Sequence, residues 1–258
     1  MAQAPAFAHP GYAEVKSTDA YANVQLDRRI LGPLQVSPPS TYRVGSQPRS
    51  CLMTTPSYWN EAARDLSSRD LVLRVLIRNH EGPYLQSRSD AFTTLARSIV
   101  GQQISVSAAE SVWQKLLESV GALGPAAIVR MDPSKLRACG LSTTKSTHLI
   151  DLAEHFLDGS LDTTGWSDHD DEQLIAELTR VKGVGCWTAE MFLIFFMMRP
   201  DILPVDDVGL QRAMSLHYNN GKPLSKLKIR QIAGAWQPWR TVATWYLWRS
   251  LATIPVEY

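Results

Sequence analysis

Asp207 has the clearest capacity for chemistry among the polar side chains of the sequence. It follows the loop Leu203-Pro204-Val205-Asp206 and stands at the start of a helical pattern that includes Leu210. A carboxylate at a helix N-terminus is stabilised by the positive end of the helix dipole. A fixed negative charge of this kind can stabilise positive charge that develops on a substrate and can orient an attacking water molecule. Asp207 is therefore the first catalytic candidate, with a plain helix-capping aspartate as the alternative.

Two glycines one residue apart mark a tight turn about twenty residues before Asp207. The turn is Lys182-Gly183-Val184-Gly185, and a second helical pattern begins at Cys186. Glycine suits a backbone that takes positive φ and approaches another molecule closely. The first N–H groups of the following helix would then form an anion site, for which nucleic-acid phosphate is the natural ligand. A buried helical hairpin with glycine at its turn is the alternative.

The elements that must position these residues are helices. Apolar residues recur at helical spacing, and no region alternates with a period of two for long enough to predict a sheet. The chain is therefore predicted to be all-α. Ser167 or Asp168 is expected to cap the helix before the hairpin, and the helix after it is apolar on nearly every face, which predicts burial. The expected helices are Ser57 to Leu66, Asp70 to Asn79, Asp90 to Val100, Val106 to Val120, Pro133 to Ala138, Thr144 to Leu157, a helix ending at Val181, Cys186 to Met198, Val208 to His217, Leu224 to Ala235 and Pro238 to Leu251.

Residues 1 to 50 differ from the rest of the chain in composition. They hold six of the 15 prolines and show no sustained apolar period, which predicts an extended arm, with a short strand near Val24 to Leu34 as an alternative. Residues 51 to 258 are predicted to form one helical domain. Because 26 Lys+Arg nearly balance 25 Asp+Glu, no global field favours an acidic or basic partner.

The cellular setting follows from what the sequence lacks. Its 3 cysteines are widely spaced and suit neither a disulfide framework nor a cysteine-rich metal site. The N-terminus does not have the pattern of a signal peptide, and the longest apolar stretch, Met191 to Met198, is far shorter than the roughly 20 residues of a membrane span. A cytoplasmic protein without membrane contact is expected.

The hairpin and the aspartate together resemble the helix-hairpin-helix (HhH-GPD) DNA glycosylase superfamily, whose hallmarks are this hairpin, a Gly/Pro-rich loop and an essential aspartate. Upstream, Ser98 to Ala109 and Cys139 to Lys145 are similar to its alkylbase branch, the 3-methyladenine DNA glycosylase II type. The resemblance covers about Ser57 to Leu251. It implies a two-lobed helical fold with the active site in the cleft between the lobes, and a monomer that acts on damaged bases in double-stranded DNA.

The resemblance distinguishes between two adjacent carboxylates. Its pattern places the essential aspartate three residues before an apolar helix position and five before a basic or polar one. Asp207 fits this spacing with Leu210 and Arg212, whereas counting from Asp206 puts Gly209 at the apolar position. Asp206 is then expected to cap the helix or to position its neighbour.

The resemblance also predicts the base pocket. Trp187 and Trp248 match positions where alkylbase glycosylases place aromatic walls around the extruded base, and an indole stacks well on a cationic alkylated purine. Core packing is the alternative for both tryptophans. Met191, one helical turn after Trp187, is expected to line the same pocket. Glu190 is expected to have a surface or capping role.

DNA contacts and a cation site are implied in the same way. Gln103 resembles the residue that relatives insert into the gap left by the flipped nucleotide, with a polar residue at a helix end as the alternative. The hairpin Lys182 to Gly185 is expected to contact DNA. Backbone carbonyls of Thr179, Val181 and Val184 match positions that hold an optional structural monovalent cation in relatives.

The implied function is that of a monofunctional DNA-3-methyladenine glycosylase, which flips alkylated purines out of duplex DNA and hydrolyses the glycosidic bond, leaving an abasic site for base excision repair. No cysteine follows Cys186, so the four-cysteine iron–sulfur cluster of other branches is absent and no cofactor is required. Excision of oxidised or deaminated bases, and a non-catalytic DNA-binding module, are the alternatives.

Trp187 generates a test of monofunctionality. Bifunctional branches carry a lysine two positions after the second hairpin glycine, where its amine attacks the sugar carbon, and here this position holds Trp187. Treatment of the protein and damaged DNA with borohydride is therefore expected to trap no covalent adduct, as judged by denaturing gel electrophoresis. A trapped adduct would contradict a water nucleophile.

Overall fold

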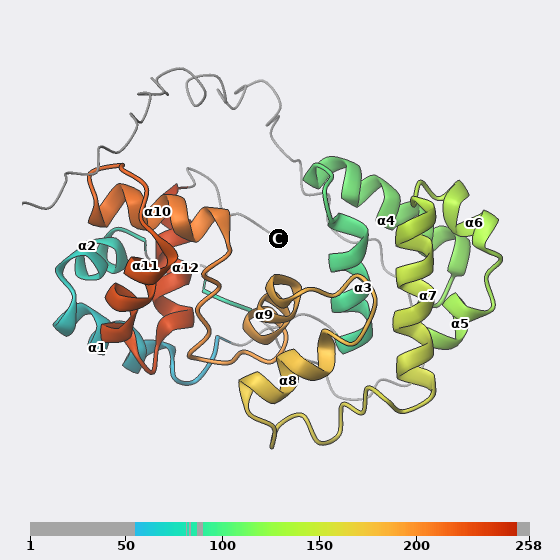
Figure 1. The fold of residues 1–258 in the computed structure, drawn as a ribbon, viewed down its shortest axis with the longest axis horizontal. Coiled ribbons are helices and arrows are strands. Elements are labelled where there is room, and N and C mark those ends of the chain that lie inside the picture. Colours follow the sequence, from blue (N-terminus) through green and yellow to red (C-terminus); the bar gives the residue numbers. More distant parts are fainter. Residues whose placement is uncertain (1–54, 81, 83, 87–89, 252–258) are drawn as a thin grey trace, which may run out of the picture. The chain divides into compact units, whose positions relative to one another are not determined.

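The described part of the chain is built from helices joined by loops, of which those after α7 and after α9 are long (Figure 1). A computed structural model describes residues 55–80, 82, 84–86 and 90–251, so the predicted proline-rich arm and its possible strand lie outside the described residues. Within these ranges there is no β-strand, which confirms the all-α prediction. None of the helices there has the length and apolar content needed to cross a membrane. The helices are α1 (Trp59–Arg69), α2 (Leu71–Asn79), α3 (Ala91–Gly101), α4 (Val106–Val120), α5 (Pro125–Val129), α6 (Pro133–Ala138), α7 (Thr143–Leu157), α8 (Asp171–Leu178), α9 (Cys186–Phe195), α10 (Val208–Tyr218), α11 (Lys226–Ala233), the 3-10 helix η1 (Gly234–Trp236) and α12 (Arg240–Leu251).

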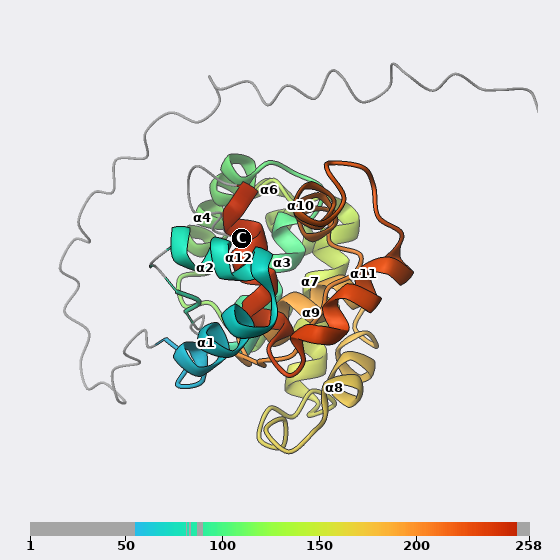
Figure 2. The ribbon, with the colours of Figure 1, turned by 90° about the vertical axis from the view of Figure 1, so that its left-hand side faces the viewer.

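The helices associate in recognisable groups. In one group α1, α2, α10 and α12 pack together, and η1 joins α11 to α1; in another, α7 packs against α3, α5 and α6, and α4 packs against α3. Helix α9 packs on α8 and on α3, which brings the glycine hairpin between α8 and α9 close to the second group (Figures 1 and 2). The description of these groups as two lobes with an active-site cleft between them stays a prediction.

Helix α9 confirms the burial predicted from its apolar faces. Thr188, Ala189 and the five residues from Met191 to Phe195 are all buried. The helix ends at Phe195 rather than at the predicted Met198. There the N–H of Met197 bonds back to the carbonyl of Phe192, and Met198 takes a φ of 56°, so the regular hydrogen-bond ladder cannot continue.

Two other helix predictions differ from the structure. Helix α5 was not expected, because it spans only 5 residues and has too few positions to show a period. Helix α8 is capped by Asp170 rather than by Ser167 or Asp168. Asp170 and Gln173 form a reciprocal capping box, which satisfies two N–H groups at once and so outcompetes a single cap.

Asp70 ties the N-terminal helices to the C-terminal part of the chain. Its Oδ1 accepts the N–H groups of Val72 and Leu73 at 2.9 and 3.0 Å and caps α2. Its Oδ2 accepts the Tyr218 hydroxyl at 2.9 Å and the Trp236 indole N–H at 3.0 Å. One carboxylate thus caps a helix and joins it to α10 and η1.

Replacement of Asp70 by alanine tests this junction. Asp70→Ala removes the cap and leaves two largely buried donors without their acceptor, so the free energy of unfolding is expected to fall by about 3 kcal/mol. The matched control is Asp132→Ala, since Asp132 is an exposed cap of α6 that accepts the Ser134 N–H. The control should lose clearly less stability than Asp70→Ala in urea denaturation. Equal losses would show that the tertiary contacts of Asp70 contribute nothing.

Candidate functional site

The site is built around the buried carboxylate of Asp207, which is only 5% exposed. Asp207 is the N-cap of α10, and its Oδ1 accepts the Leu210 N–H at 2.6 Å. The preceding loop is held in place, because the Asp207 N–H bonds to the Pro204 carbonyl at 3.0 Å and the Gln211 side chain bonds to the Val205 carbonyl at 2.8 Å. Backbone and carboxylate are therefore both fixed.

Two indole N–H groups complete the surroundings of this carboxylate. The Trp248 Nε1 donates to Asp207 Oδ1 at 2.7 Å, and the Trp187 Nε1 donates to Asp207 Oδ2 at 3.1 Å. Trp248 comes from α12 and Trp187 from α9, 41 and 20 residues away in sequence. The tertiary structure thus brings together the predicted catalytic residue and both predicted pocket tryptophans, which a plain capping aspartate would not require.

The two tryptophans differ in exposure. Trp248 is 4% exposed and stacks on Phe195 with ring centroids 6.0 Å apart and an interplanar angle of 9°. It is therefore a core residue as well as a donor to Asp207. Trp187 is 37% exposed, so core packing does not explain it. Met191 is buried at 6% exposure, and its role in lining a base pocket stays a prediction.

Gly209 belongs to this site, although its sequence position suggested no functional role. A Cβ at Gly209 would lie 3.0 Å from Asp207 Oδ1 and 3.2 to 3.3 Å from the Trp248 ring. A larger residue would therefore push the carboxylate and the indole apart. The sequence signal that could have identified Gly209 is a glycine inside the first turn of a helix, where alanine would be more stable by roughly 1 kcal/mol.

Asp206 does not cap α10, so the capping interpretation was wrong, and the alternative that it positions Asp207 stays a prediction. Its side chain is exposed and forms an ion pair with Lys226 of α11. The cap is Asp207 itself. The two neighbours separate because the chain enters the helix at Asp207, which directs one side chain inward and leaves the other in solvent.

Glu190 has neither the surface role nor the capping role that was expected. It lies in the middle of α9 and is partly buried. Burial, reinforced by the negative charges of Asp206 and Asp207, raises the pKa of its carboxyl to about 7, while Arg230 and a hydrogen bond with Cys186 act in the opposite direction. A second carboxyl that changes charge near neutral pH therefore lies within electrostatic reach of Asp207.

The glycine hairpin confirms one of the two proposed reasons for glycine. Gly183 has a φ of 83°, and a Cβ there would overlap the ring of His148, so another residue would require that side chain to move. Gly185 has a φ of −88°, which any residue can adopt, and its positive φ was wrongly predicted. A Cβ at Gly185 would meet nothing within 4 Å, so close approach of another molecule remains the predicted reason for it.

The hairpin presents an uncapped helix end. The N-cap of α9, Gly185, has no side chain to accept a hydrogen bond, and within the described residues the N–H groups of Cys186, Trp187 and Thr188 have no partner. Lys182 is exposed, but its Nζ bonds to Asp151 Oδ1 at 2.8 Å and its N–H to Asp151 Oδ2 at 2.9 Å. The contribution of Lys182 to DNA binding stays a prediction.

Gln103 lies beside the hairpin. It is exposed, follows the end of α3 and has a φ of 57°. Its neighbour Gln102 is the C-cap of α3 and donates its Nε2 to the Gly183 carbonyl at 2.8 Å. Gln102 is thus the residue that ends α3, and insertion of Gln103 into the duplex stays a prediction.

Of the carbonyls assigned to a cation, that of Thr179 lies at the C-cap of α8, and those of Val181 and Val184 lie in the hairpin that follows. The Val181 carbonyl accepts the Val184 N–H at 3.1 Å, which leaves it a second lone pair. Neutral oxygens near the negative end of a helix suit a hard monovalent cation. Binding of a cation at these carbonyls stays a prediction.

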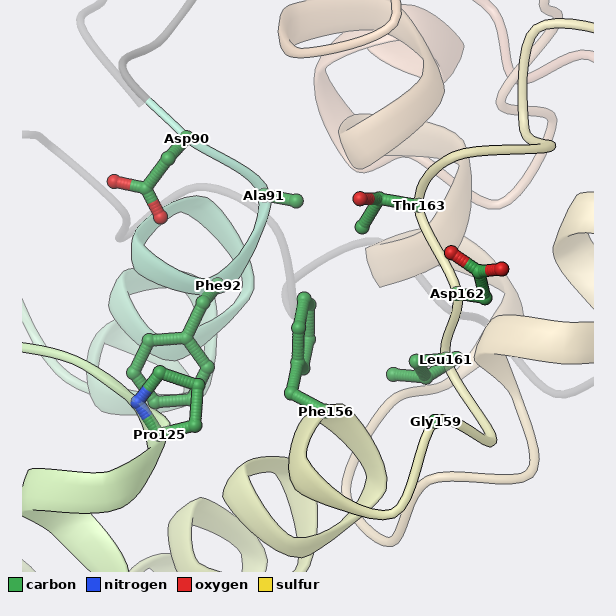
Figure 3. A pocket seen from close by; sticks show the side chains of 9 residues that line it. All are labelled: Asp90, Ala91, Phe92, Pro125, Phe156, Gly159, Leu161, Asp162 and Thr163. Atoms are coloured by element: carbon green, nitrogen blue, oxygen red, sulfur yellow. The ribbon is translucent and has the colours of Figure 1, made fainter.

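A hollow of about 440 Å³ lies elsewhere, among residues of α3, α5, α7 and the loop after α7 (Figure 3). Phe92 and Phe156 form its apolar side, with ring centroids 5.4 Å apart, and the Oδ1 of Asp90 caps α3 through the Thr93 N–H at 2.8 Å. None of the site residues above lines it. Asp207 and its indole donors therefore lie outside this hollow.

Comparisons with known proteins show which proteins this chain resembles. Residues 96–238 match the family model of the HhH-GPD superfamily base excision DNA repair protein. DNA-3-methyladenine glycosylase 1 of Schizosaccharomyces pombe is 31% identical over 180 residues, which cover 68% of this chain and 78% of the relative.

Solved structures show the same likeness. The crystal structure of DNA-3-methyladenine glycosidase from Bacillus halodurans matches with a TM-score of 0.70 and 34% identity, covering 74% of this chain and 89% of the other. The 3-methyladenine DNA glycosylase of Schizosaccharomyces pombe, in complex with abasic DNA, matches with a TM-score of 0.65 and 28% identity, covering 76% and 100%.

The raised pKa of Glu190 predicts a pH-dependent stability. The folded pKa of about 7 exceeds the ordinary 4.5, so the folded state holds the proton more tightly than the unfolded state. The stability associated with this proton is fully present below pH 4.5 and is lost as the pH rises through 7. Glu190→Gln should therefore gain about 2 kcal/mol relative to wild type on going from pH 4.5 to pH 8 in urea denaturation.

The control for Glu190 is Glu118→Gln, since Glu118 is an exposed glutamate of α4. Its free energy of unfolding is measured over the same pH range, and Glu190→Gln should gain more stability relative to wild type than this control does. If the free energies of unfolding of wild type and Glu190→Gln changed in parallel with pH, the pKa of Glu190 would be the same in the folded and unfolded states.

Proposed function

The chain belongs to the HhH-GPD superfamily of base excision DNA repair proteins, and from this premise we propose that it is a monofunctional DNA-3-methyladenine glycosylase. The observation that carries the proposal is the Asp207 carboxylate, fixed at a helix N-terminus between two indole N–H donors. The substrate would be a damaged base in double-stranded DNA, bound by one copy of the chain.

Asp207 supplies the charge that the reaction needs. When the bond between the sugar C1′ and the base nitrogen breaks, its electron pair leaves with the base and the sugar acquires oxocarbenium character. A purine alkylated on a ring nitrogen is cationic and leaves as a neutral base, so no strong general acid is required. The carboxylate stabilises the sugar cation, water adds to C1′, and the water proton passes to the carboxylate.

The two tryptophans have different parts in this proposal. Trp248 is buried against Phe195 and holds Asp207 Oδ1 in position. Trp187 is partly exposed and is oriented by its bond to Asp207 Oδ2, which suits it to stack on the extruded base. Stacking on an electron-rich indole favours a cationic purine and is tolerant of its identity.

The hairpin accounts for binding of the DNA backbone. The uncapped N–H groups at the start of α9 can bind a phosphate without reading sequence. This grip relies on backbone dipoles, which explains how a chain with a formal net charge of only +1 can bind nucleic acid.

Replacement of Asp207 tests the assignment. Asp207→Asn should lower the single-turnover rate of 7-methylguanine release from duplex DNA at least 100-fold, because the fixed negative charge is lost. Binding to a duplex with an abasic analogue should change less than about threefold, since the hairpin is intact. Alkali treatment followed by a denaturing gel measures release as strand breaks.

Asp206→Asn is the matched control, because this neighbouring carboxylate is exposed and paired with Lys226. Its release rate should stay within about threefold of wild type. Near-normal release by Asp207→Asn would overturn the assignment. The same assay on duplexes with 8-oxoguanine, hypoxanthine or uracil separates the other glycosylase activities, and no product from any duplex would leave a DNA-binding module.

A further inference from the structure

The C-terminal end of α3 receives its cation from another helix. The last turn of α3 contains no basic residue, although the carbonyls at a helix C-terminus lack partners and carry partial negative charge. Lys145 of α7 fills this place. Its Nζ donates to the Val100 carbonyl at 2.8 Å and to the Gln102 carbonyl at 2.6 Å.

Lys145 is not part of an ordinary ion pair. Within the described residues no carboxylate lies within ion-pair distance of its ammonium group, which is partly buried. Burial lowers the pKa of Lys145, because a partly buried position disfavours the charged ammonium group. The dipoles of the two carbonyls act in the opposite direction, since they attract a positive charge. Ordering a long flexible side chain in such a place also costs entropy. The bonds to the two carbonyls at the end of α3 are therefore the contacts that hold the Lys145 ammonium group in place.

The turn that Lys145 holds carries Gln103 in an unfavourable conformation. Its φ of 57° is left-handed, which costs a non-glycine residue roughly 1 kcal/mol or more. Such a conformation persists only where its surroundings determine it. On one side the Gln102 carbonyl is bound to Lys145, and on the other Ser105 caps α4. Gln103 and its neighbour Ile104, which is 41% exposed, project from the turn between these anchors.

The same face of α7 also holds the hairpin. His148, three residues after Lys145, packs on Gly183 so closely that no Cβ fits between them. Asp151, three residues farther on, binds both the N–H and the Nζ of Lys182. Residues at this spacing share one helix face. Helix α7 therefore sets the position of the Gln103 turn and of the hairpin together.

We propose that Lys145 is a positioning residue for base extrusion, which holds the α3 end so that Gln103 enters the duplex in register with the hairpin. This inference rests on the proposed function, since Gln103 acts only if a nucleotide is flipped. Lys145 touches neither DNA nor the reacting atoms in this role. It acts through Gln103, and its loss should not alter the chemistry of Asp207 directly.

The test uses the full-length protein with Lys145→Met, which keeps the chain length but removes the charge and the donors. Lys145→Arg and Lys145→Gln restore donors to different degrees. Lys135→Met, in an exposed lysine of α6, is the matched control. Gln103→Ala alone, and Gln103→Ala combined with Lys145→Met, test whether Lys145 acts through Gln103.

Two measurements are made on each variant at a temperature where melting curves show it to be folded. The first is the fluorescence of 2-aminopurine next to an abasic analogue in duplex DNA, which rises when a side chain enters the stack. The second is the single-turnover rate of 7-methylguanine release. Lys145→Met should lose most of the fluorescence rise and about tenfold in rate, Lys145→Arg should recover both, and Lys135→Met should match wild type.

The double variant distinguishes positioning from general structural damage. If Lys145 acts through Gln103, Lys145→Met should cause less than a twofold further loss in the Gln103→Ala background. The proposal would be overturned if Lys145→Met caused the same fold loss in the Gln103→Ala background as in wild type. It would also be overturned if Lys145→Met alone kept wild-type fluorescence and rate. Should Lys145→Met not fold, the same comparison is made with Lys145→Ala, which also removes the charge and the donors, and wild-type behaviour of that variant overturns the proposal. Failure of the wild type to release any base would instead refute the proposed function.

Discussion

A carboxylate removed from water must be fully hydrogen-bonded, and this constraint on Asp207 organises the site. An unpaired buried charge costs several kcal/mol, so every element that contacts Asp207 must present a donor or leave room. Helix α10 presents its first-turn N–H, α9 and α12 each present an indole, and Gly209 leaves the room that the Trp248 ring occupies. The junction of α9, α10 and α12 is therefore determined by one side chain.

A second constraint concerns the segments assigned to DNA. The hairpin and the Gln103 turn are separated by some eighty residues, and loops of this kind are individually weakly held. Helix α7 compensates, because Lys145, His148 and Asp151 contact both segments from one rigid face. The bond from Gln102 to the Gly183 carbonyl then joins the segments directly. A grip on a regular duplex requires such fixed spacing between its contacts.

Sequence reasoning succeeded where a property is local. Helical periodicity reported the apolar faces, and the predicted burial of α9 followed from its lack of a polar face. The spacing of Asp207, Leu210 and Arg212 matches the pattern of the superfamily, and this resemblance selected one of two adjacent carboxylates. The local method failed for Asp206, whose partner Lys226 lies on another helix, and for Glu190, whose raised pKa arises from burial and from charges on a loop sixteen residues away.

The sequence by itself therefore determined the helical class and the glycine hairpin, because each depends on residue types at short spacing. The candidate aspartate and the two tryptophans followed from the resemblance to the superfamily, whose motif positions they match. The tertiary structure alone decided that both indoles donate to the same carboxylate, that Gly183 makes room for His148 and that Lys145 caps α3. These contacts join residues twenty to forty-five positions apart. Their geometry depends on how helices pack, and a pattern read along one segment contains no information on the direction in which a distant side chain points.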